Sequence, residues 1–195
     1  MMDINCLLFD GFETLDLFGA VAVFSKVNQC NIRYFSIEGG TITSAQKTRI
    51  ITDGVDVINV EELLLIPGGR GTRALVNNVA FIESLKGIAE KARWCLTVCT
   101  GSALLAKTGL LDRRRATTNK MAFHWVKGQR DAVDWVGRAR WVIDQKYYTS
   151  SGISAGIDMS LGFVKDQFGE KQALEVAKIL EYEWKHDKDD DPFAV

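Results

Sequence analysis

The residue of this sequence best suited to chemistry is Cys99, which stands between an apolar run and a run of small residues. Residues 96–98 have the pattern of a strand end, and residues 100–103 have that of a helix that starts at once. A thiol in such a turn lies at the positive end of the helix dipole among backbone N–H groups, which favours the thiolate and lowers its pKa. Gly101 lets the helix pack closely enough for a sharp turn. The pattern predicts a nucleophile elbow, with a buried structural cysteine as the alternative.

Two further segments place polar groups where strands are expected to end. Gly68 and Gly69 follow an apolar run, and the N–H groups of Gly69 and Thr100 are candidates for an oxyanion hole. Glu13 and Asp16 follow the first expected strand, and an acid beside a thiolate can hydrogen-bond it and transfer a proton. Taken singly, the glycines are also ordinary turn residues, and Asp16 is also an exposed acid in the first turn of a helix.

Strand and helix patterns alternate along the chain, and these elements must position the segments above. The expected strands are 4–9, 32–37, 63–66, 94–98 and 115–118, with a hairpin or irregular edge over 41–56 and a hairpin over 138–149. The expected helices are 15–26, 72–92 with a break near 77–78, 101–107, 121–127, 155–168 and 171–184. Such alternation predicts an α/β fold with a mostly parallel sheet, helices on both faces, and ligand sites at the carboxyl ends of the strands.

The composition fits one soluble, cytoplasmic domain over residues 1–195, with a charged and frayed tail at about 185–195. A net charge of -1 gives no basic field for nucleic acid, and no apolar segment is long enough for a membrane span. Without an export signal, the four cysteines are expected to be reduced. The spacing of the cysteines and of the two histidines predicts no metal site.

Five ordered blocks of the sequence resemble the ThiJ/PfpI superfamily, which includes the parkinsonism-associated deglycase. The blocks are Phe12-Glu13-Thr14-Leu15-Asp16 with Phe24, Ile66-Pro67-Gly68-Gly69, Val98-Cys99-Thr100-Gly101-Ser102, Gly109-Leu110-Leu111-Asp112 with Arg115-Ala116-Thr117-Thr118, and Ser151-Gly152-Ile153-Ser154-Ala155-Gly156-Ile157-Asp158. The resemblance covers nearly the whole chain. It implies a flavodoxin-like three-layer sandwich, similar to class I glutamine amidotransferases, that usually forms a homodimer.

Within the superfamily, the Cys-Thr-Gly elbow and the Leu-Asp acid are most similar to the branch of isonitrile hydratases and AraC-type regulators. This resemblance implies that Cys99 attacks the terminal carbon of a small electrophile, an isonitrile, without a cofactor. Asp16 would then manage the proton and Thr100 would place water, so that a covalent thioimidate is hydrolysed to an N-substituted formamide. Further residues are expected to form the pocket: Glu13, Gly68, Arg70, Asn119, Ser151, Gly152 and Ile153.

Two positions depart from the patterns of related branches. Asn119 follows Thr117-Thr118 where a histidine is usual, which disfavours a Cys-His dyad and glyoxalase or deglycase activity. Thr100 follows Cys99 where the protease branch has histidine, which disfavours protease or amidase activity. His124, on an expected helix, is the remaining histidine that could approach Cys99, with a surface position as the alternative.

Two other functions use the same fold or the same thiol. The fold also serves as the ligand-sensing half of AraC-type regulators, so this chain could be a non-enzymatic sensor. With 195 residues, we expect no helix-turn-helix half and no direct contact with nucleic acid. A reactive cysteine can also act as a sensor of oxidation, and the sequence does not separate this role from catalysis.

Overall fold

The computed structural model describes residues 1–58 and 60–195 and has a central eight-stranded sheet. Its strands, in order across the sheet, are β3 (Glu38–Thr43), β4 (Arg49–Gly54), β2 (Cys30–Ser36), β1 (Met2–Leu7), β5 (Leu63–Ile66), β6 (Trp94–Thr97), β10 (Tyr147–Ser150) and β9 (Trp141–Asp144). Neighbouring strands are parallel except at the two edges, where β3 and β9 are antiparallel to their partners. The carboxyl ends of β1, β5 and β6 therefore meet along one end of the sheet.

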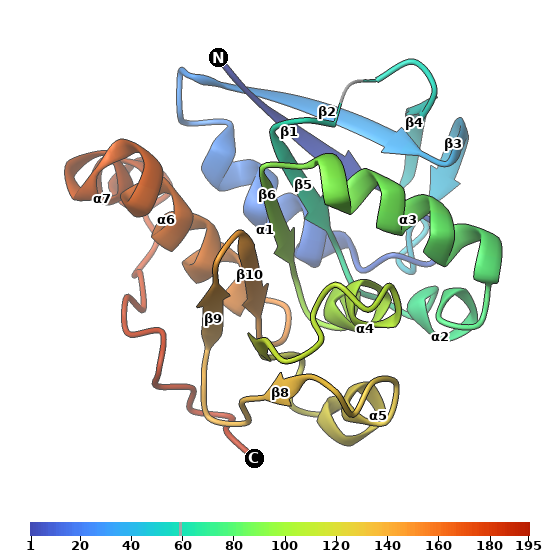
Figure 1. Cartoon of the computed structure of the whole chain (residues 1–195). Helices are drawn as coiled ribbons and strands as arrows, with labels where there is room; N and C mark the ends of the chain where they lie inside the picture. The colour runs from blue at the N-terminus through green and yellow to red at the C-terminus, as the bar shows by residue number, and fades with distance from the viewer. Residues whose placement is uncertain (59) are drawn as a thin grey trace.

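Helices cover both faces of this sheet, which makes the fold a three-layer, flavodoxin-like sandwich as predicted (Figure 1). One group of helices packs together as α1 (Thr14–Phe24), α6 (Ala155–Phe168) and α7 (Glu170–Ile179). The other group consists of α2 (Thr72–Leu75), α3 (Val79–Lys91), α4 (Gly101–Lys107) and α5 (Phe123–Lys127). A separate two-stranded sheet joins β7 (Arg115–Ala116) to β8 (Asp134–Trp135).

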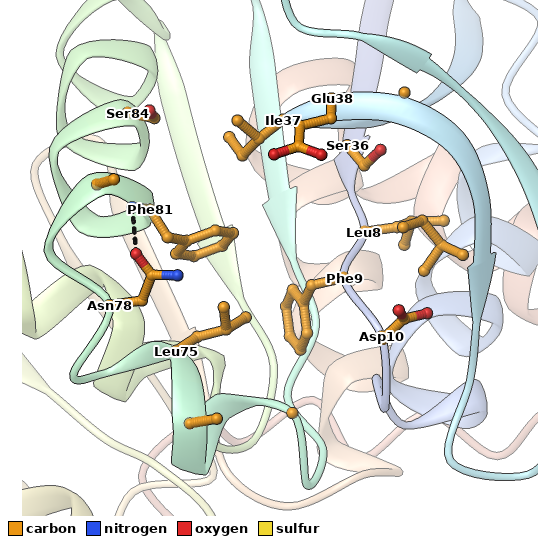
Figure 2. Close-up of a pocket in the computed structure, with 15 residues that line it drawn as sticks. Leu8, Phe9, Asp10, Ser36, Ile37, Glu38, Leu75, Asn78, Phe81 and Ser84 are labelled. Carbon is orange, nitrogen blue, oxygen red and sulfur yellow. Dashed lines mark hydrogen bonds between the residues drawn. The ribbon is translucent and has the colours of Figure 1, made fainter.

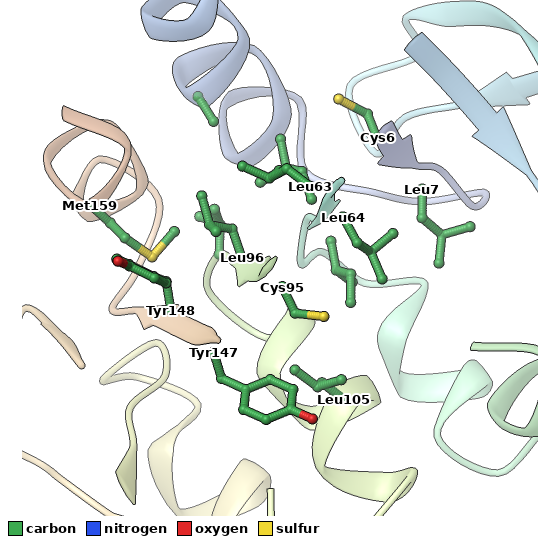
Figure 3. Close-up of a cluster of buried hydrophobic side chains, with 14 of the residues drawn as sticks. Cys6, Leu7, Leu63, Leu64, Cys95, Leu96, Leu105, Tyr147, Tyr148 and Met159 are labelled. Atoms are coloured by element: carbon green, nitrogen blue, oxygen red, sulfur yellow. The ribbon is translucent and has the colours of Figure 1, made fainter. Parts of the chain in front are cut away.

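The central strands are buried on both faces, and their side chains alternate between the two helical layers (Figure 3). Leu96 points toward Met159 of α6, whereas the preceding residue, Cys95, points toward Leu105 of α4. This explains why β5 and β6 are continuous apolar runs in the sequence. It also places Cys6 and Cys95 inside the packed core, where burial raises the pKa of both thiols.

Most expected elements are present, and the differences fall in short or terminal segments. The bounds of α4 and α6 agree with the sequence prediction, and the expected break between α2 and α3 is at residues 76–78. The strand β8 was not predicted. The last helix ends at Ile179 instead of 184, and beyond it the Trp184 indole N–H donates to the carbonyl of Asp158 at 3.1 Å.

The C-terminal tail is held against the body of the protein, so the prediction of a frayed tail was wrong. Asp191 is buried, with one carboxylate oxygen 3.7 Å from Lys120 Nζ and the other 3.8 Å from the Arg140 guanidinium. The carbonyl of Lys188 accepts from the backbone N–H of Arg140 at 2.8 Å. The tail thus supplies a carboxylate to two buried cations, of which Arg140 also pairs with Asp158 of α6, and composition alone did not reveal this.

In the described part of the chain, none of the helices has the length and apolar character needed to cross a membrane. The four cysteines are all free thiols.

Candidate active site

Cys99 occupies the turn between β6 and α4 with a backbone φ of +56°, in the left-handed region that non-glycine residues rarely adopt. Its neighbours hold it in this conformation. The backbone N–H of Cys99 donates to the Ser151 carbonyl at 3.2 Å, and the Thr118 hydroxyl donates to the Cys99 carbonyl at 2.9 Å. Backbone strain that is fixed by surrounding contacts is typical of functional positions. The geometry is that of the predicted elbow.

The sharpness of this elbow depends on Gly101, as the sequence indicated. A Cβ atom at Gly101 would lie 2.5 Å from the carbonyl oxygen of Ile66 and 2.8 Å from that of Pro67. Backbone of β5 therefore fills the space that a side chain would need, and α4 can begin directly after Thr100.

Asp16 is fully buried in the first turn of α1, next to Cys99. Its Oδ2 atom accepts from the backbone N–H of Gly68 at 2.9 Å. The backbone also ties the two loops together, since the N–H of Glu13 donates to the Gly68 carbonyl at 2.9 Å. Hydrogen bonds between the loops after β1 and β5 thus deliver the carboxyl group to the thiol, and the predicted pair of Asp16 and Cys99 is brought together.

Cys99 is 7% exposed, and the environment of its thiol favours the protonated form. Burial, followed by the charge of Asp16, raises the pKa of Cys99 to about 12. The backbone N–H groups of Thr100 and Ile153 hydrogen-bond the sulfur and lower this pKa, but burial outweighs them. The prediction that the pKa of Cys99 is lowered was therefore wrong. The backbone N–H of Thr100, at the start of α4, does lower this pKa, but by less than burial raises it.

Burial raises the pKa of Asp16 to about 7, with the charge of Glu13 adding to the effect. Hydrogen bonds from the Gly68 N–H and from Cys99 oppose it. The Oδ1 atom is buried and has no hydrogen bond of regular geometry among the described residues, although the thiol is near enough to shift its titration. A carboxyl group that titrates near neutral pH can both accept and return the proton of the adjacent thiol.

Thr100 joins the turn after β5 to the elbow. Its Oγ1 accepts from the Gly69 N–H at 3.0 Å and lies 3.2 Å from the Thr72 hydroxyl. The backbone N–H of Thr100 hydrogen-bonds the Cys99 sulfur. In this conformation the Gly69 N–H donates to Thr100 Oγ1 and the Thr100 N–H to the Cys99 sulfur, so an oxyanion hole formed by these two groups stays a prediction.

An open cavity of about 380 Å³ lies over the thiol. It is lined by Glu13, Gly69, Arg70, Arg73, Cys99, Thr100, Asn119, Met121, Ala122 and Ile153. Four of the expected pocket residues are therefore in its wall: Glu13, Arg70, Asn119 and Ile153. Arg73, Met121 and Ala122 were missed. Arg73 could have been found from its position, because it lies in the first turn of the helix that follows the loop of Gly68, Gly69 and Arg70.

The other three expected pocket residues lie behind this wall and shape it. A Cβ atom at Gly68 would be 2.6 Å from the Thr100 nitrogen and 2.8 Å from Asp16 Oδ2, so only glycine leaves room for both. Ser151 is buried and holds the Cys99 N–H through its carbonyl. Gly152 packs against the side-chain amide of Asn119. These residues position the site without lining the cavity.

His124 is exposed on α5, where its ring meets the edge of Phe123, and it is not among the residues that line the cavity over Cys99. His124 therefore has the surface position that was the alternative to an approach to Cys99. Among the described residues, no group of three or more histidine, cysteine or carboxylate side chains could hold a metal ion.

A larger cavity, of about 460 Å³, lies between the end of β1, the β2–β3 connection and the start of α3 (Figure 2). Its walls are mostly apolar, and Figure 2 shows Phe9 next to Phe81. Their rings meet edge to face, with centroids 6.2 Å apart. Its lining contains no cysteine, histidine or lysine. Cys99 thus lines the smaller of these two cavities, where we place the candidate active site.

The sequence is similar to known proteins of two kinds. The chain is 30% identical to an isonitrile hydratase of Pseudomonas putida, over 93% of this chain and 78% of that protein. It is 27% identical to the HTH-type transcriptional regulator GbdR of Pseudomonas aeruginosa over 92% of this chain, which spans half of the regulator's length.

Solved structures show the same architecture. A ThiJ/PfpI family protein from Pseudomonas syringae superposes with a TM-score of 0.85 at 25% identity, covering 93% of this chain and 75% of that one. DJ-1beta of Drosophila melanogaster superposes with a TM-score of 0.79 at 19% identity, covering 94% and 99%. The DJ-1/PfpI family pattern matches residues 2–166, and the chain therefore belongs to the DJ-1/PfpI family.

Proposed function

We propose that this protein is a cysteine-dependent enzyme that hydrates a small isonitrile to an N-substituted formamide. The observation that carries the proposal is that Cys99 lines an open cavity and that Asp16 lies next to Cys99, behind the cavity wall. A buried carboxyl group with a pKa near neutrality is suited to move a proton between sulfur and substrate carbon. The similarity to the Pseudomonas putida isonitrile hydratase supports this choice of reaction.

In the first step, ionised Asp16 takes the thiol proton as the sulfur of Cys99 attacks the terminal carbon of the isonitrile. The carbon–sulfur bond forms, and Asp16 returns the proton to that carbon. The product is a covalent thioimidate with a C–H bond and a C=N bond. Proton transfer during attack avoids a free thiolate, which the burial of Cys99 disfavours.

In the second step, water adds to the thioimidate carbon and the carbon–sulfur bond breaks. Thr100 lines the cavity beside Cys99 and would orient this water. One water proton passes to the substrate nitrogen, the other restores the Cys99 thiol, and the formamide leaves. The sum is isonitrile plus water to formamide, so the reaction needs no oxidant, reductant or cofactor.

The test compares wild type with Cys99→Ser, using a panel of small isonitriles and methylglyoxal. We expect wild type to release formamide from at least one isonitrile and Cys99→Ser to lose this activity. Cys95→Ser is the matched control, because Cys95 is buried in β6 and lies outside the cavity lining. Absence of formamide from every isonitrile, or equal rates in wild type and Cys99→Ser, contradicts the proposal.

A second candidate function is a sensor, and the open cavity over Cys99 favours one that binds a small molecule. A protonated, nearly buried thiol is less suited to sensing oxidants, which react with accessible thiolates. Similarity to transcriptional regulators is consistent with a ligand-sensing role for this fold. If neither an isonitrile nor methylglyoxal is turned over, peptide mass spectrometry after peroxide treatment tests whether Cys99 senses oxidation or not. Stepwise oxygen addition confined to Cys99 supports an oxidation sensor, whereas an unmodified Cys99 argues against one.

A further inference from the structure

We propose that the substrate carries a carboxylate, which Arg70 and Arg73 bind in the wall of the cavity while its electrophilic carbon meets Cys99. This inference rests on the proposed function for the identity of the reacting carbon. It names the substrate class: small, anionic electrophiles in preference to neutral ones of the same size.

Arg73 is held in a defined orientation by Trp125. The guanidinium carbon of Arg73 lies 3.5 Å from the centroid of the Trp125 ring, a close cation–π contact. Stacking uses the face of the guanidinium group and leaves the N–H groups at its edge for a ligand. Since Arg73 also lines the cavity over Cys99, this edge is available to a molecule that binds there.

Arg70 supplies a second guanidinium group from the loop after β5. It lines the same cavity and directly follows Gly69, whose backbone contacts the Thr100 side chain. Among residues 1–58 and 60–195, neither Arg70 nor Arg73 has a carboxylate within ion-pair distance. Guanidinium groups without a protein counter-charge match the planar, two-oxygen geometry of a carboxylate.

The nearby acids leave this positive charge only partly compensated. Glu13 lines the cavity, but both its oxygens accept from the side-chain amide of Gln46, at 2.9 and 2.8 Å. Asp10 borders Arg70 from a neighbouring hollow, and its Oδ1 accepts from the Thr43 N–H at 2.8 Å. Asp16 lies behind the thiol and is not in the cavity wall. The wall therefore presents two cations and one carboxylate.

Alkylation of Cys99 tests the inference without requiring hydratase activity. Iodoacetate and iodoacetamide have the same reacting carbon and similar size, but only iodoacetate carries a carboxylate. We measure the second-order rate constant of each at Cys99 by peptide mass spectrometry and take their ratio. The ratio cancels differences in thiol reactivity between variants. We expect Arg70→Gln and Arg73→Gln each to lower the iodoacetate-to-iodoacetamide ratio about 3- to 10-fold.

Arg93→Gln is the matched control. Arg93 also stacks on a tryptophan, with its guanidinium carbon 4.2 Å from the Trp94 ring, but it lies outside the cavity lining. We expect this variant to keep the wild-type ratio. Raising the salt concentration to about 1 M is expected to lower the wild-type ratio, because salt screens the attraction between the arginines and iodoacetate. The ratio of the double variant Arg70→Gln/Arg73→Gln, which lacks both charges, is expected to change little.

An unchanged ratio in both arginine variants, or an equal loss in Arg93→Gln, overturns the inference. The substrate class is then read from kcat/KM for a carboxylate-bearing isonitrile and a neutral one of the same size. Hydration of the neutral compound alone leaves the proposed function standing and overturns the inference. The opposite outcome is a high iodoacetate-to-iodoacetamide ratio that depends on the arginines, with no hydration of either isonitrile. It supports an anionic ligand and contradicts the proposed hydratase activity.

Discussion

Asp16 and Cys99 each shift the pKa of the other, in opposite directions. Hydrogen bonding with the thiol lowers the pKa of Asp16, whereas the charge of Asp16 raises the pKa of Cys99. Burial raises both, to about 7 and about 12. As the pH rises, the first proton therefore leaves the pair from the carboxyl group while the sulfur is still protonated.

The first prediction is that kcat/KM for isonitrile hydration rises with pH through about 7, as Asp16 becomes ionised and able to accept the thiol proton. Asp16→Asn is expected to remove this step and to lower kcat/KM about 100-fold or more. The measurement is the pH profile of kcat/KM for both proteins. A wild-type profile that rises only above about pH 8.5, as for an ordinary thiol, contradicts the role of Asp16.

The second prediction concerns stability. Folding raises the pKa of Asp16 from 3.8 to about 7, so between these values the folded state binds more protons than the unfolded state. The contribution of Asp16 to the free energy of unfolding is therefore expected to decrease as the pH rises through this window. The decrease is on the order of a few kcal/mol.

Asp16→Asn, which cannot ionise, is expected to lack this contribution. Urea unfolding of both proteins at pH 5 and pH 8 measures it. We expect the free energy of unfolding of wild type to decrease, relative to that of the variant, between pH 5 and pH 8. A constant difference between the proteins would show that Asp16 is charged in the fold throughout.

The sequence predicted the parts of the fold and the site that depend on local patterns. Buried strands such as β5 and β6 are continuous apolar runs, and the elbow around Cys99 follows from an apolar run that meets small residues. The convergence of Asp16 and Cys99 followed from the rule that parallel strands end at one edge of the sheet.

The rest depended on tertiary contacts that no local pattern records. Whether burial or the helix N-terminus decides the pKa of Cys99 depends on how much protein covers it. The ordered tail could not be foreseen, because Asp191 finds its counter-charges in Lys120 and Arg140, which are distant from it in sequence. A strand of only two residues, such as β8, is too short to show a period.

The third prediction tests the close packing at Gly68. In Gly68→Ala, the added methyl group would lie 2.6 Å from the Thr100 nitrogen and 2.8 Å from Asp16 Oδ2, so these groups must separate. We expect a loss of about 1–3 kcal/mol in the free energy of unfolding and slower alkylation of Cys99 by iodoacetamide.

Gly87→Ala is the matched control for this change. Gly87 lies within α3, and a Cβ there meets no atom within 4 Å. Because alanine favours helix over glycine, this variant is expected to gain up to about 1 kcal/mol and to keep the wild-type alkylation rate. A Gly68→Ala protein that behaves like Gly87→Ala would mean that the loop after β5 does not set the geometry of the site.

The fourth prediction concerns the buried ion pairs of the tail. Asp191→Asn removes the carboxylate that faces Lys120 and Arg140. Among the described residues, Asp158 is then the one carboxylate left to compensate these buried cations, through its pair with Arg140. We expect a loss of about 2–4 kcal/mol in the free energy of unfolding by urea. The tail should also become sensitive to trypsin after Lys185 and Lys188.

Asp189→Asn provides the control, because Asp189 pairs with Lys188 on the exposed surface and should contribute less than about 1 kcal/mol. The tail bears on the site through Lys120, which directly follows Asn119 in the cavity wall. If the tail holds this segment in place, Asp191→Asn should also alter the alkylation rate of Cys99, and Asp189→Asn should not. Equal stability and equal trypsin resistance in the two variants would mean that backbone hydrogen bonds, such as that from Arg140 to Lys188, are enough to hold the tail.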